Sequence, residues 1–473
     1  MYDKVGNFSE WYTHVIIDSG FVDYSAISGC LVLRPDSYFA WEIIQAYVDR
    51  RFKEVGIQNT YFPLLIPERL LQKEQDHVKG FSPEVAWVTH AGDSKLDERL
   101  AIRPTSETIM YDSYSKWIKS WRDLPMRLNQ WNSVLRWEFK HPTPFIRGRE
   151  FLWNEGHTVF ATKEEAEAER DQILGIYYDA LKECLALPGI RGKKTDNEKF
   201  AGAEASYSIE HIMPDGKALQ GPDFHNDGQN FAKAFNIMFI DKDEQKKYAY
   251  QNTFAISTRV LGVMAATHGD NKGLVLPPKL ARVQIVVVPI YNNNNKWDVI
   301  NAAKGIAAEV SKHARVYLDD RDSYSPGWKF NDWELKGTPI RIEIGEKDMK
   351  SNSVVVAIRH NGRKISVGVA ELDAKIPKLL EEIHIDMYNK SVAFLESMIH
   401  KAKTRDELAK VLEKGGIAQA GWCGSLECEL KVKEETGAKI TNMPFDMQEL
   451  AKDTVCVQCG SKAKHIANFA KSY

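Results

Sequence analysis

The sequence is short of cysteine and of long apolar runs, and each shortage narrows what the protein can be. Only 6 of its 473 residues are cysteine, too few for a disulfide framework in a chain of this length. No uninterrupted apolar segment is long enough to cross a bilayer, and the first ten residues are polar, unlike a secretory leader. These features predict a cytoplasmic protein without a membrane partner.

The chain also lacks an excess of charge of either sign. Its 63 basic and 65 acidic residues give a net charge of −2, so any nucleic-acid partner must contact a local basic patch. A hydrophobic fraction of 43% and a charged fraction of 27% are ordinary for globular proteins. The length leads us to expect two to four domains.

Hydrophobic periodicity divides the chain into three regions. Residues 1–279 mix helices, expected over 41–55, 107–121 and 162–184, with two strands, expected over 126–138 and 149–160. Residues 280–384 follow a Pro-Pro hinge and alternate short strands and helices, which indicates a small α/β domain. Residues 385–473 form the third region. A long helix, expected over 370–413 with a break near Ile385, leads into this region.

Four of the six cysteines lie close to the end of the chain. Cys423 and Cys428 form one close pair, and Cys456 and Cys459 form another after 27 intervening residues. Two close pairs at a distance are typical of a tetrahedral zinc site, and four protein ligands make it structural because no position stays open for water. The alternative is four unrelated buried cysteines. Cys30 and Cys184 are expected to be core residues.

Charged residues follow two predicted strands in the first region. Arg136 and Glu138 end the first strand, and alternation places Arg147, Arg149, Phe151, Trp153, Glu155 and His157 on one face of the second. Cations, rings and carboxylates on one face suit a ligand that carries phosphate and an aromatic ring. The alternative is a solvated hairpin held by ion pairs.

These residues resemble the signatures of the class II aminoacyl-tRNA synthetases. Arg136 and Glu138, followed by a loop and then Arg147 and Phe151, resemble the second signature, and Ser257-Thr-Arg259 resembles the third.

Further runs point to one branch of that class. Arg34-Pro35 resembles the first signature, whose proline lies at a dimer interface. Residues 103–107 (Arg-Pro-Thr-Ser-Glu) and 149–157 (Arg-Glu-Phe-Leu-Trp-Asn-Glu-Gly-His) resemble prolyl-tRNA synthetases. The resemblance covers nearly the whole chain. It implies a homodimer and an α+β catalytic domain with an antiparallel sheet, followed by an α/β anticodon-binding domain and a small α/β zinc-binding C-terminal domain.

The resemblance also implies roles for residues that bind ATP. Arg136 should hold the α-phosphate and the carboxylate of proline, Glu138 should read the adenine amino group, and Arg147 should contact the γ-phosphate. Phe151 and Arg259 should enclose the adenine ring, and Arg136 and Arg259 are the expected catalytic residues.

Two more polar residues are expected beside the nucleotide. Gln220 should contact ATP or Mg²⁺, and Ser257 should lie near the nucleotide. The run from Gln220 to His225 departs from the Gly-Thr-Ser-His of many relatives, which leaves the role of Asp223 open.

The proline pocket is implied in the same way, with six residues expected to contact or shape it: Thr105, Glu107, Trp153, Glu155, His157 and His225. Thr105 could also be the N-cap of a helix with Glu107 in its first turn, and the two roles of Thr105 are compatible. Without the resemblance, His157 and His225 would be read as ordinary members of polar networks.

The second region resembles an anticodon-binding domain. Aromatic residues among cations over residues 319–341 suit unstacked bases. Glu334 and Arg341 are expected to read the guanines of the tRNA(Pro) anticodon, although a mixed-charge surface helix would look similar. The carboxylate of Tyr473, the last residue, is expected to reach the catalytic domain.

Only 101 residues separate His157 from Arg259. The catalytic fold needs most of them, so we expect no inserted editing domain, and alanine and cysteine are expected to be misactivated because both are small enough for a proline pocket. The rival readings are another class II synthetase, such as a threonyl enzyme, and an inactive relative that only binds tRNA.

Overall fold

A large sheet organises the chain. The computed structural model describes residues 3–77, 84–138 and 141–473. Eleven strands of this part of the chain form one sheet, in the order β20 (Ile399–Lys401), β21 (Ile417–Trp422), β23 (His465–Ala470), β22 (Lys439–Pro444), β9 (Ile190–Lys193), β10 (Ala205–Ile212), β11 (Ala218–Gly228), β14 (Tyr250–Ser257), β8 (Glu150–Phe160), β7 (Met126–Leu135) and β3 (Gln58–Asn59). The strands from β9 to β7 pair antiparallel throughout, which confirms the antiparallel catalytic sheet.

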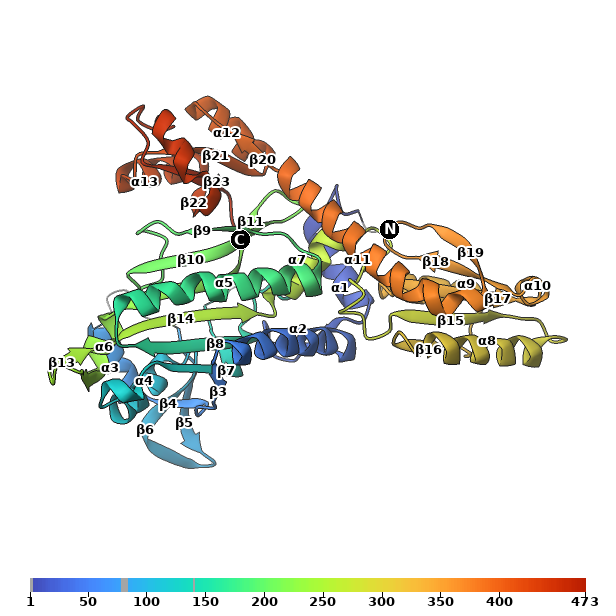
Figure 1. The fold of residues 1–473 in the computed structure, drawn as a ribbon, viewed down its shortest axis with the longest axis horizontal. Helices are drawn as coiled ribbons and strands as arrows, with labels where there is room; N and C mark the ends of the chain where they lie inside the picture. Colours follow the sequence, from blue (N-terminus) through green and yellow to red (C-terminus); the bar gives the residue numbers. More distant parts are fainter. Residues whose placement is uncertain (1–2, 78–83, 139–140) are drawn as a thin grey trace.

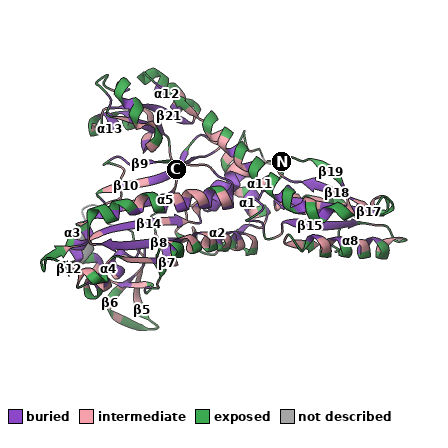
Figure 2. Ribbon diagram, in the orientation of Figure 1, coloured by how far each residue is buried: buried purple, intermediate pink, exposed green. Residues whose placement is uncertain are grey.

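Two long helices cover one face of this sheet. α2 (Pro35–Glu54) and α5 (Lys163–Leu185) lie along it (Figure 1). α5 begins with a capping box in which Thr162 accepts from the backbone of Glu165. Its apolar face is buried through Ile173, Tyr177 and Leu181, in the helix that the sequence predicted over residues 162–184. Figure 2 shows buried residues along β8 and β14 and exposed residues on the outer side of α2 and α5.

Smaller elements complete the first region. α1 (Phe8–Asp18) and α7 (Arg259–His268) pack together, near the hairpin of β1 (Val22–Tyr24) and β2 (Leu31–Leu33). A three-stranded sheet, β4 (Leu65–Pro67), β6 (Ser94–Ile102) and β5 (Trp87–Ala91), adjoins α3 (Glu68–His77). The remaining elements are α4 (Glu107–Trp117), η1 (Trp121–Asp123), α6 (Asn230–Phe235), β12 (Met238–Ile240) and β13 (Lys246–Tyr248).

A five-stranded sheet forms the second region. Its order is β16 (Val316–Leu318), β15 (Ile285–Ile290), β17 (Ile340–Gly345), β18 (Ser353–Ile358) and β19 (Lys364–Gly368). The inner strand β15 is apolar on both faces because both faces are covered. Ile285 and Val287 pack in the core on the side of α8 (Lys296–Val310). Val286 and Val288 pack against Trp333 of α9 (Pro326–Leu335). α10 (Glu346–Lys350) and η2 (Val369–Glu371) link later elements.

The long helix into the third region differs from our prediction. α11 runs from Leu372 to Ser397 without a break at Ile385, so that expectation is wrong. The interruption comes later, where β20 precedes α12 (Arg405–Lys414), which Thr404 caps. The apolar face of α11 stays in register with the α/β core through Ile383 and Met387, which explains why the helix continues. The expected boundary between residues 384 and 385 lies inside it.

The C-terminal unit extends the catalytic sheet. β22 pairs with β9 through Met443 with Lys193 and Pro444 with Gly192. A side chain at Gly192 could not be accommodated, because its Cβ would lie 2.5 Å from the Met443 carbonyl oxygen. α13 (Leu426–Thr436) and η3 (Phe445–Asp453) complete this unit. None of the helices that the structure describes is both long and apolar enough to span a bilayer.

The end of the chain returns to the first region (Figure 1). Ser472 forms a bridge with Ala218 at the start of β11, and the hydroxyl of Tyr473 donates to Asp215 at 2.8 Å. The Tyr473 ring packs against the catalytic core.

Candidate active site

Alternation along β8 separates structural from candidate functional side chains. Asn154 faces α5, where the Tyr177 hydroxyl donates to its Oδ1 at 2.9 Å. Trp153, Glu155 and His157 alternate to the other face, where Glu155 meets the segment before α4 and His157 meets Tyr111 of α4. This face is therefore free of the covering helices.

A cavity of about 280 Å³ opens beside these strands. Its lining includes eight of the residues that the sequence singled out: Thr105, Glu107, Arg136, Trp153, Glu155, His157, Gln220 and His225. They come from the segment before α4, from α4 itself, from the end of β7 and from β8 and β11, so the fold gathers residues that are far apart in the chain.

Glu155 is the most heavily bonded residue of the cavity. It is 2% exposed, and its carboxylate accepts from the Ser106 backbone at 2.9 Å, from the Ser106 hydroxyl, from Asn132 at 2.5 Å and from Gln130 at 3.2 Å. His157 Nε2 lies 3.2 Å away. Burial alone would raise the pKa of Glu155, but the bonds from His157, Ser106 and Asn132 lower it to about 2. The residue is thus a buried carboxylate that organises its neighbours.

Thr105 and Glu107 lie at the start of α4. Thr105 donates to Glu107 Oε2, and both side chains are buried. The N-cap is Ser106, whose hydroxyl bonds to Glu155, so the expectation of Thr105 as the helix cap is wrong. Glu107 does stand in the first turn, as predicted. The pair presents a carboxylate to the cavity, which the ring of Trp153 also lines. The Trp153 indole donates to Asn132 Oδ1 at 2.7 Å.

Two arginines adjoin the cavity beside an aromatic ring. The Arg136 guanidinium lies 5.4 Å from the Phe151 ring centre and 5.2 Å from that of Trp153. Arg259, the first residue of α7, donates to the Gln220 carbonyl at 3.3 Å. Burial, and then the nearby Arg136, lower the pKa of Arg259. The arginines are therefore close enough to repel one another, and a polyanion between them would relieve that repulsion.

The ends of the two strands differ from the prediction. β7 ends at Leu135. The backbone N–H of Arg136 still donates to the Arg149 carbonyl at 2.7 Å, as in a sheet. Glu138 lies beyond this bond and is exposed. β8 begins at Glu150, so Arg147 and Arg149 precede the strand rather than alternate along it. The reason is the intervening turn, where Thr143 and Arg147 pair across a tight bridge. Five predicted ATP-binding residues are not among those that line the cavity: Glu138, Arg147, Phe151, Ser257 and Arg259.

On β11, Asp223 takes part in the site. It accepts from Gln220 Nε2 at 2.8 Å and lies 3.6 Å from His225 Nε2. His225 Nδ1 contacts the Ser206 hydroxyl at 2.8 Å. Burial lowers the pKa of His225, which favours the neutral imidazole. On the neighbouring β14, the hydroxyl of Ser257 accepts from the Arg259 backbone at 3.3 Å.

Several lining residues escaped the sequence analysis. Phe200 stacks on His225 with ring centres 4.8 Å apart, and Lys194 forms a buried ion pair with Glu210 at 2.6 Å. Both precede β10 in a stretch without a motif, and only the pairing of β9, β10 and β11 brings them to the cavity. Ser106 could have been found, since it stands inside the 103–107 run.

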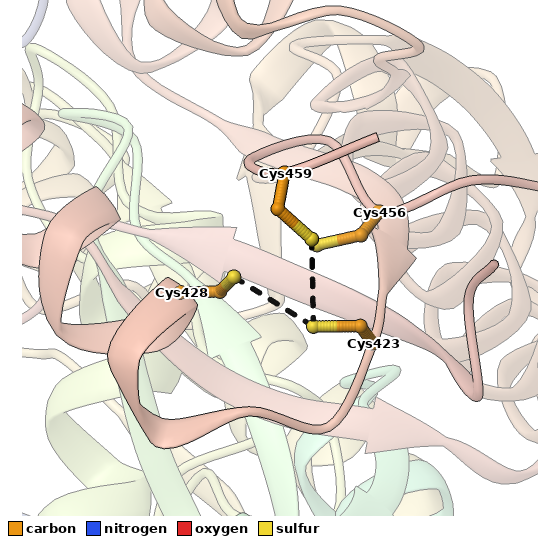
Figure 3. Close-up of side chains that lie close together, drawn as sticks. All are labelled: Cys423, Cys428, Cys456 and Cys459. Carbon is orange, nitrogen blue, oxygen red and sulfur yellow. Dashed lines mark hydrogen bonds between the residues drawn. The ribbon is translucent and has the colours of Figure 1, made fainter. Parts of the chain in front are cut away.

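The four C-terminal cysteines converge, as predicted. Cys423 lies 3.6 Å from Cys428 and 3.8 Å from Cys459, sulfur to sulfur (Figure 3), and all four sulfurs lie within 4.8 Å of one another. A tetrahedral zinc–thiolate site with bonds of about 2.3 Å has edges of about 3.8 Å, so the donor set fits this ion. Bonds from Ser461 lower the pKa of Cys459 to about 6, which favours the thiolate.

The turns around these cysteines use glycine in the left-handed region of the backbone. Gly424 and Gly460 have φ of +83° and +72°, which a residue with a Cβ rarely adopts. Cys30 and Cys184 are buried and form no disulfide, which agrees with their prediction as core residues.

A further cavity of about 280 Å³ lies on the five-stranded sheet and contains both predicted anticodon residues. Arg341 is held by Glu343 at 2.8 Å, with its guanidinium 4.1 Å from the Phe330 ring centre. Glu334 pairs with Lys272 at 3.0 Å. The cavity thus combines a ring, a guanidinium and a carboxylate.

Comparison with known proteins agrees with this arrangement. Residues 87–268 match the tRNA synthetase class II core domain (G, H, P, S and T), residues 284–379 the anticodon binding domain, and residues 405–473 the C-terminal domain of prolyl-tRNA synthetase. The chain is 48% identical to proline–tRNA ligase 2 of Bacillus cereus over 99% of this chain and 97% of that protein. It is 47% identical to proline–tRNA ligase of Cenarchaeum symbiosum over 99% and 98%.

A solved structure is also similar over its full length. The prolyl-tRNA synthetase from Cryptosporidium parvum, complexed with halofuginone and AMPPNP, is 44% identical, and the match covers 100% of this chain and 99% of that one with a TM-score of 0.95. Fold, cavity and full-length similarity agree, and the chain belongs to the prolyl-tRNA synthetases of class II.

Proposed function

We propose that this enzyme activates L-proline with ATP and Mg²⁺ to prolyl-adenylate and transfers the prolyl group to the 3′ end of tRNA(Pro). The observation that carries the proposal is the cavity lined by Arg136, by the ring of Trp153 and by the buried carboxylates of Glu107 and Glu155. An oxygen of the proline carboxylate attacks the α-phosphorus, the bond to the bridging oxygen breaks, and pyrophosphate leaves. Positioning and charge neutralisation supply most of the catalysis.

The nucleotide would occupy the arginine side of the cavity. Arg136 would hold the α-phosphate and the proline carboxylate, and Phe151 and Arg259 would enclose the adenine. Arg147 and Glu138 are exposed in the structure, so their proposed contacts with the γ-phosphate and the adenine amino group require both residues to turn inward when ATP binds. The Mg²⁺ ion would accompany the phosphates.

Gln220 lines the cavity, whereas Ser257 does not. Gln220 already bonds to Asp223 at 2.8 Å, so Asp223 would fix the orientation of the amide that meets ATP or Mg²⁺. Ser257 bonds to the Arg259 backbone and would hold the start of α7 beside the nucleotide.

Proline would occupy the other side. Glu107 would accept from the proline ammonium, because Thr105 uses only one of its two carboxylate oxygens. Trp153 and His225 would border the apolar ring of proline. Glu155, saturated by protein donors, would shape the pocket and not bind the ammonium itself, and His157 would support Glu155.

The substrate is tested by amino-acid-dependent exchange of pyrophosphate into ATP across the twenty amino acids. We expect strong exchange with proline and weaker exchange with alanine and cysteine. Exchange that depends on threonine, or no exchange at all, would contradict the proposal.

The anticodon cavity would read the guanines of tRNA(Pro). Arg341 can donate to guanine O6 and N7, and Glu334 can accept from N1 and N2, once each leaves its protein partner. Arg341→Ala should lower kcat/KM for charging by about 5- to 150-fold, the effect of losing ~1–3 kcal/mol of base discrimination, without changing pyrophosphate exchange. Arg363→Ala, an exposed arginine of the same unit, is the control. Equal charging by both variants would contradict the assignment.

We propose that the enzyme has no hydrolytic editing activity. The residues between His157 and Arg259 form α5, α6 and the strands from β9 to β14, so they build and cover the catalytic sheet. Deacylation of alanyl-tRNA(Pro) by the pure enzyme would contradict this, whereas accumulation of the mischarged tRNA would support it.

The remaining proposals concern assembly. The enzyme would act in the cytoplasm as a homodimer with structural zinc at the cysteine site. Apolar side chains exposed around β1, β2 and the start of α2 support a dimer interface there: Tyr24, Ile27, Val32 and Tyr38. Light scattering should give twice the chain mass of 53.9 kDa. The Tyr473 carboxylate would help to hold the catalytic core, so deleting the last two residues should lower proline activation.

A further inference from the structure

A second and larger cavity, of about 590 Å³, lies where the C-terminal unit meets the catalytic sheet. We call it the junction cavity. Its lining combines three rings with five basic residues: Tyr207, Trp422 and Phe445, and Arg170, Lys193, Lys194, Lys464 and His465. Asp196 is the acidic residue among the lining groups.

The junction cavity adjoins the active-site cavity, because Tyr207 and Lys194 line both. Tyr207 packs against Phe224, whose ring stacks on Phe254 in the core below α5. Lys193 pairs with Tyr207 across the β9–β10 ladder and so shares its face. The next residue, Lys194, is buried and pairs with Glu210. Lys193 and Lys464 line the junction cavity and not the active-site cavity, so a ligand held by these two lysines need not displace proline or ATP.

The junction cavity holds positive charge that the protein does not neutralise. Lys193 and Lys464 are exposed, and neither forms an ion pair with a residue that the structure describes. In contrast, Lys433 and Lys439 in the same unit both pair with Glu198. His465 lines the same cavity as both lysines, and burial, followed by these two charges, lowers its pKa.

The aromatic side of the cavity is already ordered. The Arg170 guanidinium lies 5.0 Å from the ring centre of Tyr207 and 5.7 Å from that of Phe445, and Asp171 holds the same guanidinium at 2.9 Å. The Trp422 indole donates to the Ser425 carbonyl at 3.2 Å. Little side-chain entropy would be lost when a flat ligand binds to these groups.

We propose that the junction cavity binds an unpaired segment of tRNA, with phosphates against Lys193 and Lys464 and a base against the rings. Rings beside cations are the general means of holding single strands without sequence preference. The volume of the junction cavity, about 590 Å³ against about 280 Å³ for the active-site cavity, favours a single-stranded segment over one nucleotide. The proposal rests on the proposed function, because it takes tRNA as the RNA that this enzyme meets.

The test is the salt dependence of tRNA(Pro) binding, measured by fluorescence anisotropy. Removing two contacts to single-stranded phosphates should reduce the slope of log K against log salt by about 1.4, so Lys193→Ala/Lys464→Ala should show this change and weaker binding. The matched control is Lys410→Ala/Lys414→Ala, which removes two exposed lysines from α12 of the same unit. Proline-dependent pyrophosphate exchange should be unchanged in both variants, which shows that they fold.

A slope in the double variant equal to that of the wild type and the control would overturn the proposal. A second result would also overturn it: AMP quenches Trp422 fluorescence, and the double variant leaves the salt slope of tRNA binding unchanged. The cavity would then bind free nucleotides. Failure of the wild-type enzyme to charge tRNA(Pro) would contradict the proposed function. This measurement needs neither variant, so it is distinct from the test of the junction cavity.

Discussion

Glu155→Gln should be among the most damaging substitutions that preserve the shape of a side chain. The carboxylate accepts from Ser106, Asn132 and Gln130, and an amide must turn its NH₂ group toward one of these donors. The pKa of Glu155 falls from 4.5 to about 2 in the folded enzyme. Each tenfold change in an acid constant corresponds to about 1.4 kcal/mol, so the folded state favours the carboxylate by about 3 kcal/mol.

The sign of the effect defines its pH window. Because the folded pKa lies below the unfolded one, the contribution of Glu155 is fully present above about pH 4.5 and is lost as the pH falls toward 2. The difference in stability between wild type and Glu155→Gln should therefore be about 3 kcal/mol at pH 7 and should shrink as the pH falls below 4.5.

The assay combines the first urea unfolding transition with the KM for proline in pyrophosphate exchange. Glu155→Gln should shift the transition to lower urea and raise the KM. Glu150→Gln, at the exposed start of the same strand, is the control and should change neither. A Glu155→Gln enzyme with the wild-type transition and KM would refute the reasoning.

Three further outcomes follow from single contacts. Gly156→Ala would place Cβ 1.9 Å from the Phe254 ring, so it should destabilise the enzyme by about 1–3 kcal/mol by the overpacking rule in urea unfolding; an unchanged midpoint would contradict the packing argument. Arg359→Ala removes a two-bond pair with Asp270 that joins the anticodon and catalytic units at 2.6 and 2.7 Å, so charging of tRNA(Pro) should fall more than charging of a minihelix without an anticodon; equal losses would contradict this role. A strong chelator, or Cys459→Ser, should make the C-terminal unit sensitive to protease while residues 1–380 survive, and unchanged digestion would show that no metal supports this unit.

Local signals in the sequence predicted most of the fold. The amphipathic pattern of residues 162–184 predicted α5, and alternating short strands and helices predicted the domain that contains β15. These features depend on neighbours within a few positions. The antiparallel catalytic sheet was expected through family resemblance, since its strand order depends on contacts between distant segments.

The failures share a cause, which is tertiary context. The break placed near Ile385 ignored the α/β core, which buries Ile383 and Met387 and carries α11 on to Ser397. Thr105 looked like a helix cap, but Ser106 takes that position. The bond between β22 and β9, which extends the catalytic sheet into the C-terminal unit, joins segments about 250 residues apart and leaves no pattern in the sequence.

The candidate site shows the same contrast between residues marked by a local motif and residues placed only by tertiary contacts. The motifs identified Arg136, Glu155 and His225, because a family signature marks the residues themselves. Phe200 and Lys194 carry no signature, and they reach the cavity only through the pairing of β9, β10 and β11.

The central claim is that proline and the nucleotide meet in one cavity of this sheet. A crystal structure of the enzyme with a non-hydrolysable prolyl-adenylate analogue tests it directly. We expect the proline ring between Trp153 and His225, its nitrogen at Glu107, and the phosphate mimic at Arg136. An analogue bound outside this cavity, or bound with the adenine away from Phe151 and Arg259, would contradict the account.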